Sequence, residues 1–157
     1  MVKGGDLTKH VVTETGIRPM RKSLQSLVIV SALCGLTITA HADDAGDIRA
    51  VISQQLQAFK TGDSTTAYSF AAPNIQRMFP SAEIFMSMVQ SGYAPVFQSS
   101  NATFGPLQAE GSGFRQEVNL TDPGGQSYVA SYTLARQPDG SLKITSCTIR
   151  KGNDLSA

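Results

Sequence analysis

Histidine and cysteine, which most often act as catalytic bases, nucleophiles and metal ligands, are rare in this chain of 157 residues. Both histidines, His10 and His41, lie in its first 41 residues, and Cys147 is the one cysteine after them. The rest of the chain therefore lacks the imidazole of a Ser-His-Asp or Cys-His system and has no zinc-ligand spacing. The glycine pair Gly124-Gly125 falls in a turn, not in a strand-to-helix phosphate loop. We predict no metal and no cofactor.

Carboxylates are the remaining candidates for general acid–base catalysis, and one of them would need burial to bring its pKa near neutrality. Strand alternation turns Glu117 outward, whereas Asp63 stands at a helix cap and Asp139 stands in a turn. Glu110 lies near a strand end, where alternation determines the orientation of a side chain less well than it does for the other carboxylates. We therefore predict solvated carboxylates and no catalytic residue. The alternative is a one-residue slip in the strand, which would turn Glu117 inward.

Tyrosines and one glutamine supply the polar groups that the pattern turns toward the interior. A tyrosine combines an apolar ring with one hydrogen-bonding tip, so it suits a ligand cavity or a core in which the hydroxyl meets the backbone. An arginine nearby is a candidate for binding an anion, with a solvated surface position as the alternative. The candidate ligand-binding residues are Tyr68, Tyr93, Gln116, Tyr128, Tyr132 and Arg77.

An apolar, methionine-rich zone surrounds this arginine in the sequence. Two interpretations fit it: ordinary core, or an adaptable surface that binds a partner protein or a second copy of the chain, because methionine adjusts to varied partners. The zone consists of Met78, Phe79, Phe85, Met86 and Met88.

The N-terminal region has the order of parts that is typical of a secretory signal peptide. Arg21 and Lys22 precede an apolar run of 12 residues at 27–38, and Ala40-His41-Ala42 then offers a cleavage site. We predict a signal peptide at residues 20–42, cleavage after Ala42 and an exported, periplasmic product. The alternative is an uncleaved anchor in the inner membrane, although spanning takes roughly 20 apolar residues. Because Met20 begins the basic segment of this signal peptide, we predict that it is the true start and that residues 1–19 are a mis-annotated extension or a disordered segment.

The remaining chain suits a single domain, which we place at residues 43–150, with a flexible tail at 151–157. Its length is close to the roughly 100–150 residues of most domains. Hydrophobic residues make up 41% and charged residues 16% of the whole chain, which excludes a disordered protein. The net charge of +1 provides no bulk attraction to nucleic acid. A lone Cys147 allows no internal disulfide, so packing alone must hold the domain together.

Hydrophobic spacing predicts helices in the first half of this domain. A period of 3.6 residues appears at about 45–60, 64–72 and 81–92. Pro73 is expected to end the second helix, and Asn74 to cap a short turn before the third. In the third helix the expected buried stripe is Ile84, Phe85, Met88 and Val89, and an extended link is expected from Tyr93 to Phe97.

The period then changes to two residues, which predicts strands at 102–109, 113–121, 126–136 and 141–150. Gly105-Pro106 kinks the first of these strands. A phase change near Thr145-Ser146 predicts a bulge in the last. Helices followed by strands indicate an α+β fold, with the N-terminal helices packed on a curved, cone-like four-stranded antiparallel sheet.

Four segments carry a resemblance to a known family: IRAVISQQLQAF (48–59), AYSFAAPNIQRMF (67–79), FMSMVQSGYAPVF (85–97) and RQPDG (136–140). Through them the chain is similar to an uncharacterised family of short exported bacterial proteins, a domain of unknown function. In outline it also resembles the nuclear-transport-factor-like and cystatin-like cone folds. The resemblance implies a cone fold but no activity, because cone folds include isomerases, cyclases, dehydratases and binding modules.

Two functions of different classes fit these observations. The first is a non-catalytic exported module that binds a small apolar ligand or a partner protein, with a homodimer as one form of the latter. The second is a small enzyme of the isomerase or dehydratase type, using a tyrosine with one carboxylate. We favour the first, because the predicted interior is apolar and contains no histidine, metal-binding set or acid.

Overall fold

The computed structural model describes residues 42–152. Several expectations concern parts of the chain outside this range: the signal peptide before Ala42, the alternative membrane anchor, the extension at residues 1–19, both histidines and most of the tail. Within the described range, no helix has the length and apolar character needed to cross a membrane.

The longest helix, α1 (Ala42–Thr61), forms where the spacing predicted a helix, because its apolar residues recur on one face. Ile48, Ile52 and Phe59 on that face are buried. The helix ends at Gly62, whose φ of 70° lies in the left-handed region that glycine enters without strain.

Four shorter helices follow: α2 (Ser64–Ser69), α3 (Pro73–Met78), α4 (Ala82–Gly92) and α5 (Ala94–Phe97). Two of them begin at side-chain caps. Asp63 Oδ1 accepts a hydrogen bond from the Thr66 backbone N–H at 3.0 Å, and Ser81 Oγ accepts one from the Ile84 N–H at 3.2 Å. These bonds satisfy backbone donors that the first turn of a helix leaves without partners.

The expected boundaries in this helical region were wrong at two places. Pro73 begins α3 instead of ending α2, and Ala72 rather than Asn74 is the N-cap, because a proline at the first helical position has no N–H to satisfy. The expected extended link is a helical turn, α5, since Pro95 is accommodated in its first turn.

The buried stripe of α4 is also different from the expected one. Phe85, Met86 and Val89 are buried, whereas Ile84 is 51% exposed. This helix packs against α2 as well as against the core. The buried face of α4 therefore turns toward α2 and the core, and Ile84 lies on the opposite side of the helix.

The four strands are β1 (Asn101–Glu110), β2 (Gly113–Thr121), β3 (Ser127–Arg136) and β4 (Leu142–Lys151), and they form an antiparallel sheet in the order β1-β2-β3-β4. Both expected irregularities are confirmed. The β1–β2 register shifts between Phe104 and Leu107, at the Gly105-Pro106 kink. The β3–β4 register passes from Leu134↔Ile144 to Thr133↔Ser146, which leaves Thr145 as the bulged residue.

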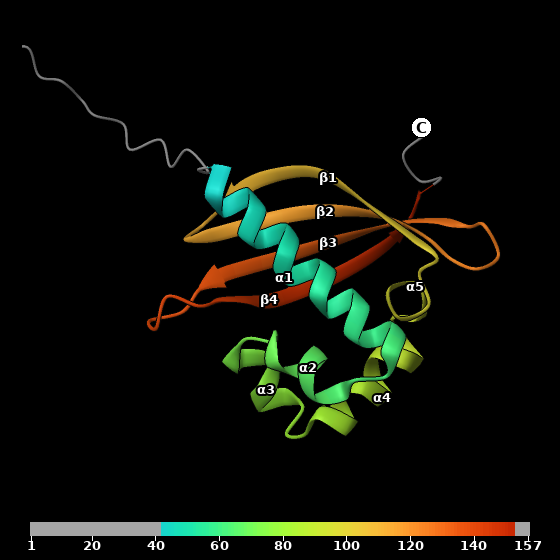
Figure 1. Cartoon of the computed structure of the whole chain (residues 1–157), viewed down its shortest axis with the longest axis horizontal. Helices are drawn as coiled ribbons and strands as arrows, with labels where there is room; N and C mark the ends of the chain where they lie inside the picture. Colours follow the sequence, from blue (N-terminus) through green and yellow to red (C-terminus); the bar gives the residue numbers. More distant parts are fainter. Residues whose placement is uncertain (1–41, 153–157) are drawn as a thin grey trace, which may run out of the picture. The chain divides into compact units, whose positions relative to one another are not determined.

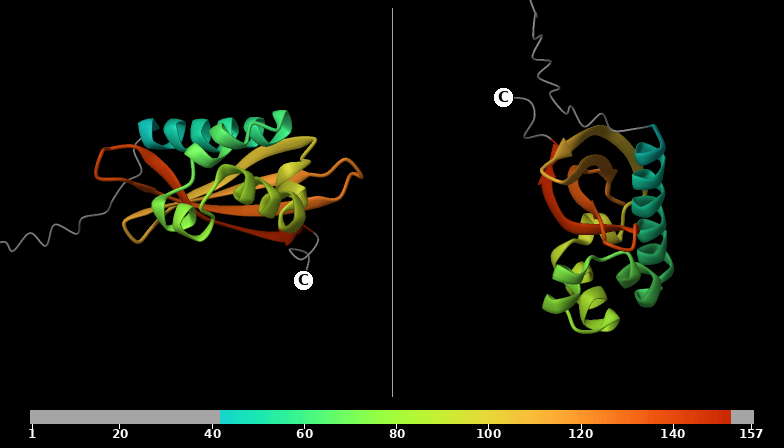
Figure 2. Two further views of the ribbon diagram at one scale, coloured as in Figure 1. Left: turned by 90° about the horizontal axis from the view of Figure 1, so that it is seen from below. Right: turned by 90° about the vertical axis from the view of Figure 1, so that its left-hand side faces the viewer.

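Helix α1 runs across one face of the sheet, and the sheet curves around that face (Figures 1 and 2). The core lies between them and contains Ile48 and Ile52 of α1 with Val118 and Leu120 of β2. Helix α3 and the segment that joins it to α2 lie beside β4. The Ala72 N–H donates to the Ile144 carbonyl at 2.8 Å, and the Ile144 N–H donates to the Phe70 carbonyl at 2.9 Å. The sequence-predicted α+β fold, helices on a curved four-stranded sheet, is confirmed.

Candidate functional site

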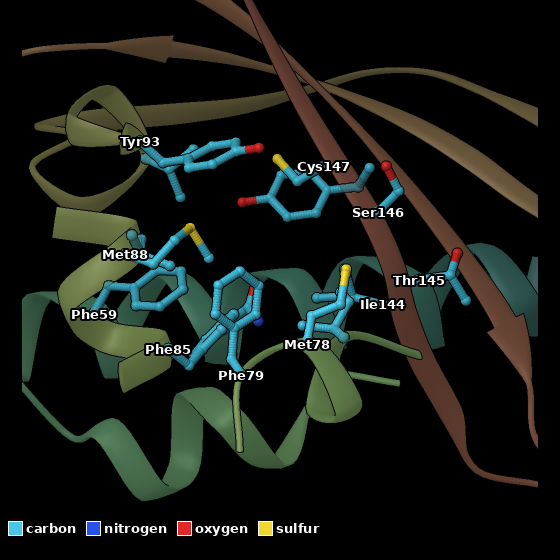
Figure 3. A pocket seen from close by; sticks show the side chains of 15 residues that line it. Phe59, Met78, Phe79, Phe85, Met88, Tyr93, Ile144, Thr145, Ser146 and Cys147 are labelled. Carbon is cyan, nitrogen blue, oxygen red and sulfur yellow. The ribbon is translucent and has the colours of Figure 1, made fainter. Parts of the chain in front are cut away.

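A cavity of about 230 Å³ lies between the helices and strands β3 and β4 (Figure 3). One wall comes from the helices and the segments that join them, and it is mostly apolar and aromatic. The opposite wall comes from the sheet and carries most of the polar groups. The helical wall consists of Gln55, Phe59, Ile75, Met78, Phe79, Phe85, Met88, Val89, Tyr93 and Val96, and the sheet wall consists of Tyr132, Ile144, Thr145, Ser146 and Cys147.

Aromatic packing holds the helical wall together. The ring centroid of Phe85 lies 6.2 Å from that of Phe59, 6.1 Å from that of Phe79 and 5.6 Å from that of Tyr68. These separations are typical of tilted and edge-to-face aromatic pairs. The Tyr68 hydroxyl also donates to the Phe79 carbonyl at 2.6 Å, so it fixes the segment between α3 and α4 that carries Phe79.

The sheet wall depends on the bulge in β4. Because Thr145 is an extra residue, both Ile144 and Cys147 face inward, although they are three positions apart. Cys147 is thereby the register partner of Tyr132 on β3, and Tyr132 is in turn the partner of Gln116 on β2. A polar row thus crosses the inner face of the sheet, and its β3 and β4 members line the cavity.

Burial controls the protonation of these two cavity residues. It raises the pKa of the Tyr132 phenol well above its usual value of 10, and the neighbouring thiol adds to this shift. It raises the pKa of the Cys147 thiol from 9.0 to about 12. Both groups are therefore neutral at physiological pH. A thiol held neutral is a poor nucleophile, because the thiolate is the reactive form.

The lining of the cavity includes two exposed residues, Met78, which is 63% exposed, and Ser146. None of the described residues that line it is charged. The ion pairs lie elsewhere. Arg150 Nη2 is 3.2 Å from Glu117 Oε1, and Arg136 Nη2 is 2.6 Å from Asp44 Oδ1. The cavity therefore suits a neutral, largely apolar molecule.

The six candidate binding residues do not form one site. Tyr93 and Tyr132 line the cavity, but Tyr68 stands behind the aromatic wall, with its hydroxyl bonded to backbone. The buried Gln116 is the β2 member of the polar row, and its Nε2 donates to the Gly105 carbonyl at 2.9 Å.

The other two candidates lie outside the cavity. Tyr128 pairs with Leu120 and Lys151 at the far end of its strand, and Arg77 is exposed. Sequence reasoning missed Thr145, Ser146 and Cys147. The predicted bulge was the one signal for them, since a bulge redirects side chains.

The carboxylates lie in the positions that the sequence indicated. Glu117 is on the outer face of the sheet, and its side chain is 29% exposed. The Arg115 guanidinium donates to Glu110 Oε1 at 2.7 Å and holds the pKa of that carboxyl below its usual value. No Asp or Glu is among the described residues lining the cavity. Within the same part of the chain, no cluster of His, Cys, Asp and Glu is arranged to hold a metal ion.

Several solved structures resemble the chain at low sequence identity. An NTF-2-like protein of unknown function from Silicibacter pomeroyi has a TM-score of 0.48 and 14% identity, over 69% of this chain and 96% of its own. Another NTF-2-like protein of unknown function, from Burkholderia xenovorans, has a TM-score of 0.43 and 13% identity, over 68% of this chain and 84% of its own. A protein from Catenulispora acidiphila has a TM-score of 0.47 and 14% identity, over 73% of this chain and 95% of its own.

None of the curated proteins compared with the chain matches it. A family model does: it is described as a domain of unknown function, DUF4864, and it matches residues 41–157, well over half of the chain. The resemblance carried by the four sequence segments is thereby confirmed. The chain belongs to the DUF4864 family, a domain of unknown function.

Proposed function

We propose that this domain is a non-catalytic module that binds one small, neutral, largely apolar molecule in the cavity between its helices and strands β3 and β4. The observation that carries the proposal is the lining: an aromatic wall faces a sheet wall with a few polar groups, and the described lining contains no charge. Ligand sites are typically concave and apolar, with a small number of placed polar groups.

The volume of the cavity limits the size of the ligand. An apolar cavity of about 150 Å³ holds benzene, and the pockets that bind drug-sized ligands measure about 300–1,000 Å³. The volume of about 230 Å³ lies between these values. It fits a molecule with a single ring and a short substituent, or a short branched chain.

Catalysis by a tyrosine and a carboxylate receives less support than binding. Such a mechanism requires an acid or base within hydrogen-bonding reach of the bound molecule. Tyr93 and Tyr132 line the cavity, but no carboxylate does so within the described residues, and Glu117 points to the outer face in an ion pair.

We further propose that the domain acts after export, with its N-terminal segment removed after Ala42. Two observations support this. Residues 20–42 have the parts of a signal peptide in order, and the family match begins at residue 41, next to the expected cleavage site. Intact-mass measurement of protein expressed with its natural N-terminus tests the point. A soluble product that retains its first 42 residues would contradict it.

The binding proposal is tested by thermal unfolding of the purified protein with toluene, ethylbenzene and acetophenone as probes. A ligand at about ten times its Kd stabilises the folded state by about 1.4 kcal/mol, which raises the Tm by several degrees in a domain of this size. The variant Val89→Phe fills part of the cavity and should remove the shift. The matched control, Ile84→Phe on the exposed side of the same helix, should keep it.

Two results would refute the binding proposal. One is the absence of a shift with every probe in the natural protein. The other is an equal shift in both variants, which would place the bound probe outside the cavity. A sizing column run in parallel measures the oligomeric state, because a partner protein or a second copy at the exposed Met78 and Ile84 is the alternative form of binding.

A further inference from the structure

The Tyr132 hydroxyl is an unpaired polar group at the wall of the cavity. The residue is 1% exposed, and its hydroxyl oxygen has no oxygen or nitrogen partner in the described part of the chain, where the Cys147 sulfur lies beside it. Buried polar groups nearly always have a partner, so an exception requires an explanation. Two further buried atoms share this condition, Ser99 Oγ and Gln116 Oε1, but neither residue lines the cavity. Of these three residues, Tyr132 is therefore the one that lines the cavity.

Tyr68, in the neighbouring aromatic cluster, provides a comparison. Its hydroxyl meets the carbonyl oxygens of Phe79 at 2.6 Å and Gln76 at 3.2 Å. The fold thus supplies backbone acceptors for this tyrosine and none for Tyr132, which has the Cys147 thiol beside it. Sulfur is a weak hydrogen-bonding partner, so the thiol does not replace an oxygen acceptor.

The phenol is a donor that lacks an oxygen acceptor. It keeps its proton, because burial raises the pKa of Tyr132 well above its usual value, and the pKa of Cys147 is raised to about 12. A phenol can donate one hydrogen bond and accept others, but its proton needs an acceptor. A carboxylate is an acceptor, but the described lining offers no cation to offset its charge, and burying an unpaired charge is very costly. The fitting partner is a neutral oxygen.

We infer that the molecule bound in this cavity carries a neutral carbonyl oxygen, which accepts a hydrogen bond from the Tyr132 hydroxyl while its hydrocarbon part packs against Phe59 and Phe85. This inference rests on the proposed function and names its ligand class: small neutral ketones and esters. The placement of the polar and aromatic side chains agrees with it, with Tyr93 of the helical wall near Cys147 of the sheet wall. Figure 3 shows Tyr93 and Cys147 on one side of the cavity and Phe79 and Phe85 across from them, so a molecule with one polar end has a defined orientation.

The test compares two probes of nearly equal shape. Acetophenone has a carbonyl oxygen, and isopropenylbenzene has a methylene group in its place. Their dissociation constants are measured by calorimetry for the natural protein, for Tyr132→Phe, and for Tyr128→Phe. Tyr128 is a matched control, because it faces the same side of β3 but does not line the cavity.

We expect Tyr132→Phe to weaken acetophenone binding about tenfold and to leave isopropenylbenzene binding unchanged, while Tyr128→Phe changes neither. A second readout is the infrared stretching frequency of carbonyl-labelled acetophenone. It should be lower in the natural protein than in Tyr132→Phe, because the hydrogen bond weakens the C=O bond. Tyr132→Phe should fold normally, since it removes a buried hydroxyl that has no partner.

The outcomes separate the inference from the function on which it rests. If both probes bind and Tyr132→Phe weakens both equally, or neither, the carbonyl contact is refuted while the binding function stands. An unchanged carbonyl frequency refutes the contact in the same way. If neither probe binds the natural protein, the proposed function fails first.

Discussion

Replacing Gln116 by methionine should destabilise the domain strongly. Its buried amide donates hydrogen bonds to backbone carbonyls where the pairing of β1 with β2 is interrupted. Gly105 and Pro106 of β1 lie together opposite Glu117 of β2, so regular pairing is interrupted there. The two hydrogens of Gln116 Nε2 are shared among three carbonyl oxygens, those of Gly105 at 2.9 Å, Pro106 at 3.2 Å and Glu117 at 2.8 Å. Methionine has a similar length and no donor. It would leave these carbonyls without their side-chain partner.

The magnitude follows from the number of carbonyls that lose a partner. Each buried polar group left unpaired costs about 1–3 kcal/mol. Pro106 is exposed, so water can replace its partner, and two carbonyls bear most of the cost. Removal of the unpaired Gln116 Oε1 offsets part of it. We expect a net loss of about 2–4 kcal/mol, a large share of the roughly 5–15 kcal/mol that holds a domain folded.

Urea unfolding followed by circular dichroism measures this loss. The midpoint should fall in Gln116→Met while the slope m is unchanged, because the surface exposed on unfolding is the same. Gln108→Met on the exposed side of β1 is the matched control and should stay within about 0.5 kcal/mol of the natural protein. If Gln116→Met were as stable as this control, the structural role assigned to Gln116 would be wrong.

Two further predictions concern Cys147. Burial raises the pKa of its thiol from 9.0 to about 12. At pH 8, iodoacetamide should alkylate this thiol roughly 1,000-fold more slowly in the folded protein than in urea, because the thiolate is the reactive form. Peptide mass spectrometry measures both rates, and equal rates would contradict the burial of the Cys147 side chain. Stability should also fall as pH rises from about 9 toward 12, since the unfolded chain releases the thiol proton first. The part of the loss at pH 10 that is due to Cys147 should be about 1.4 kcal/mol by urea unfolding. Cys147→Ala should remove that part and leave the dependence that comes from Tyr132, whose pKa burial also raises; a loss at pH 10 as large in the variant as in the natural protein would contradict the assignment to Cys147.

Much of the fold followed from local patterns. The positions of α1 and the four strands are visible in the spacing of apolar residues, which is set by the helix and strand periods. The break at Gly105-Pro106 was predicted from a glycine and a proline inside a strand, and the bulge at Thr145 from a phase change in the pattern. The predicted helix boundaries were wrong at Pro73 and Pro95, because a proline can either end one helix or begin the next.

The candidate site depended on contacts between distant segments. The sequence indicates that Tyr68, Gln116 and Tyr132 point inward, and it does so equally for all three. Only the tertiary structure gives Tyr68 the carbonyl of Phe79, assigns Gln116 to the break in β1 and leaves Tyr132 without a partner. Periodicity determines which face of an element a side chain occupies. What that face meets, and whether a space remains there, is decided by packing between elements far apart in the chain.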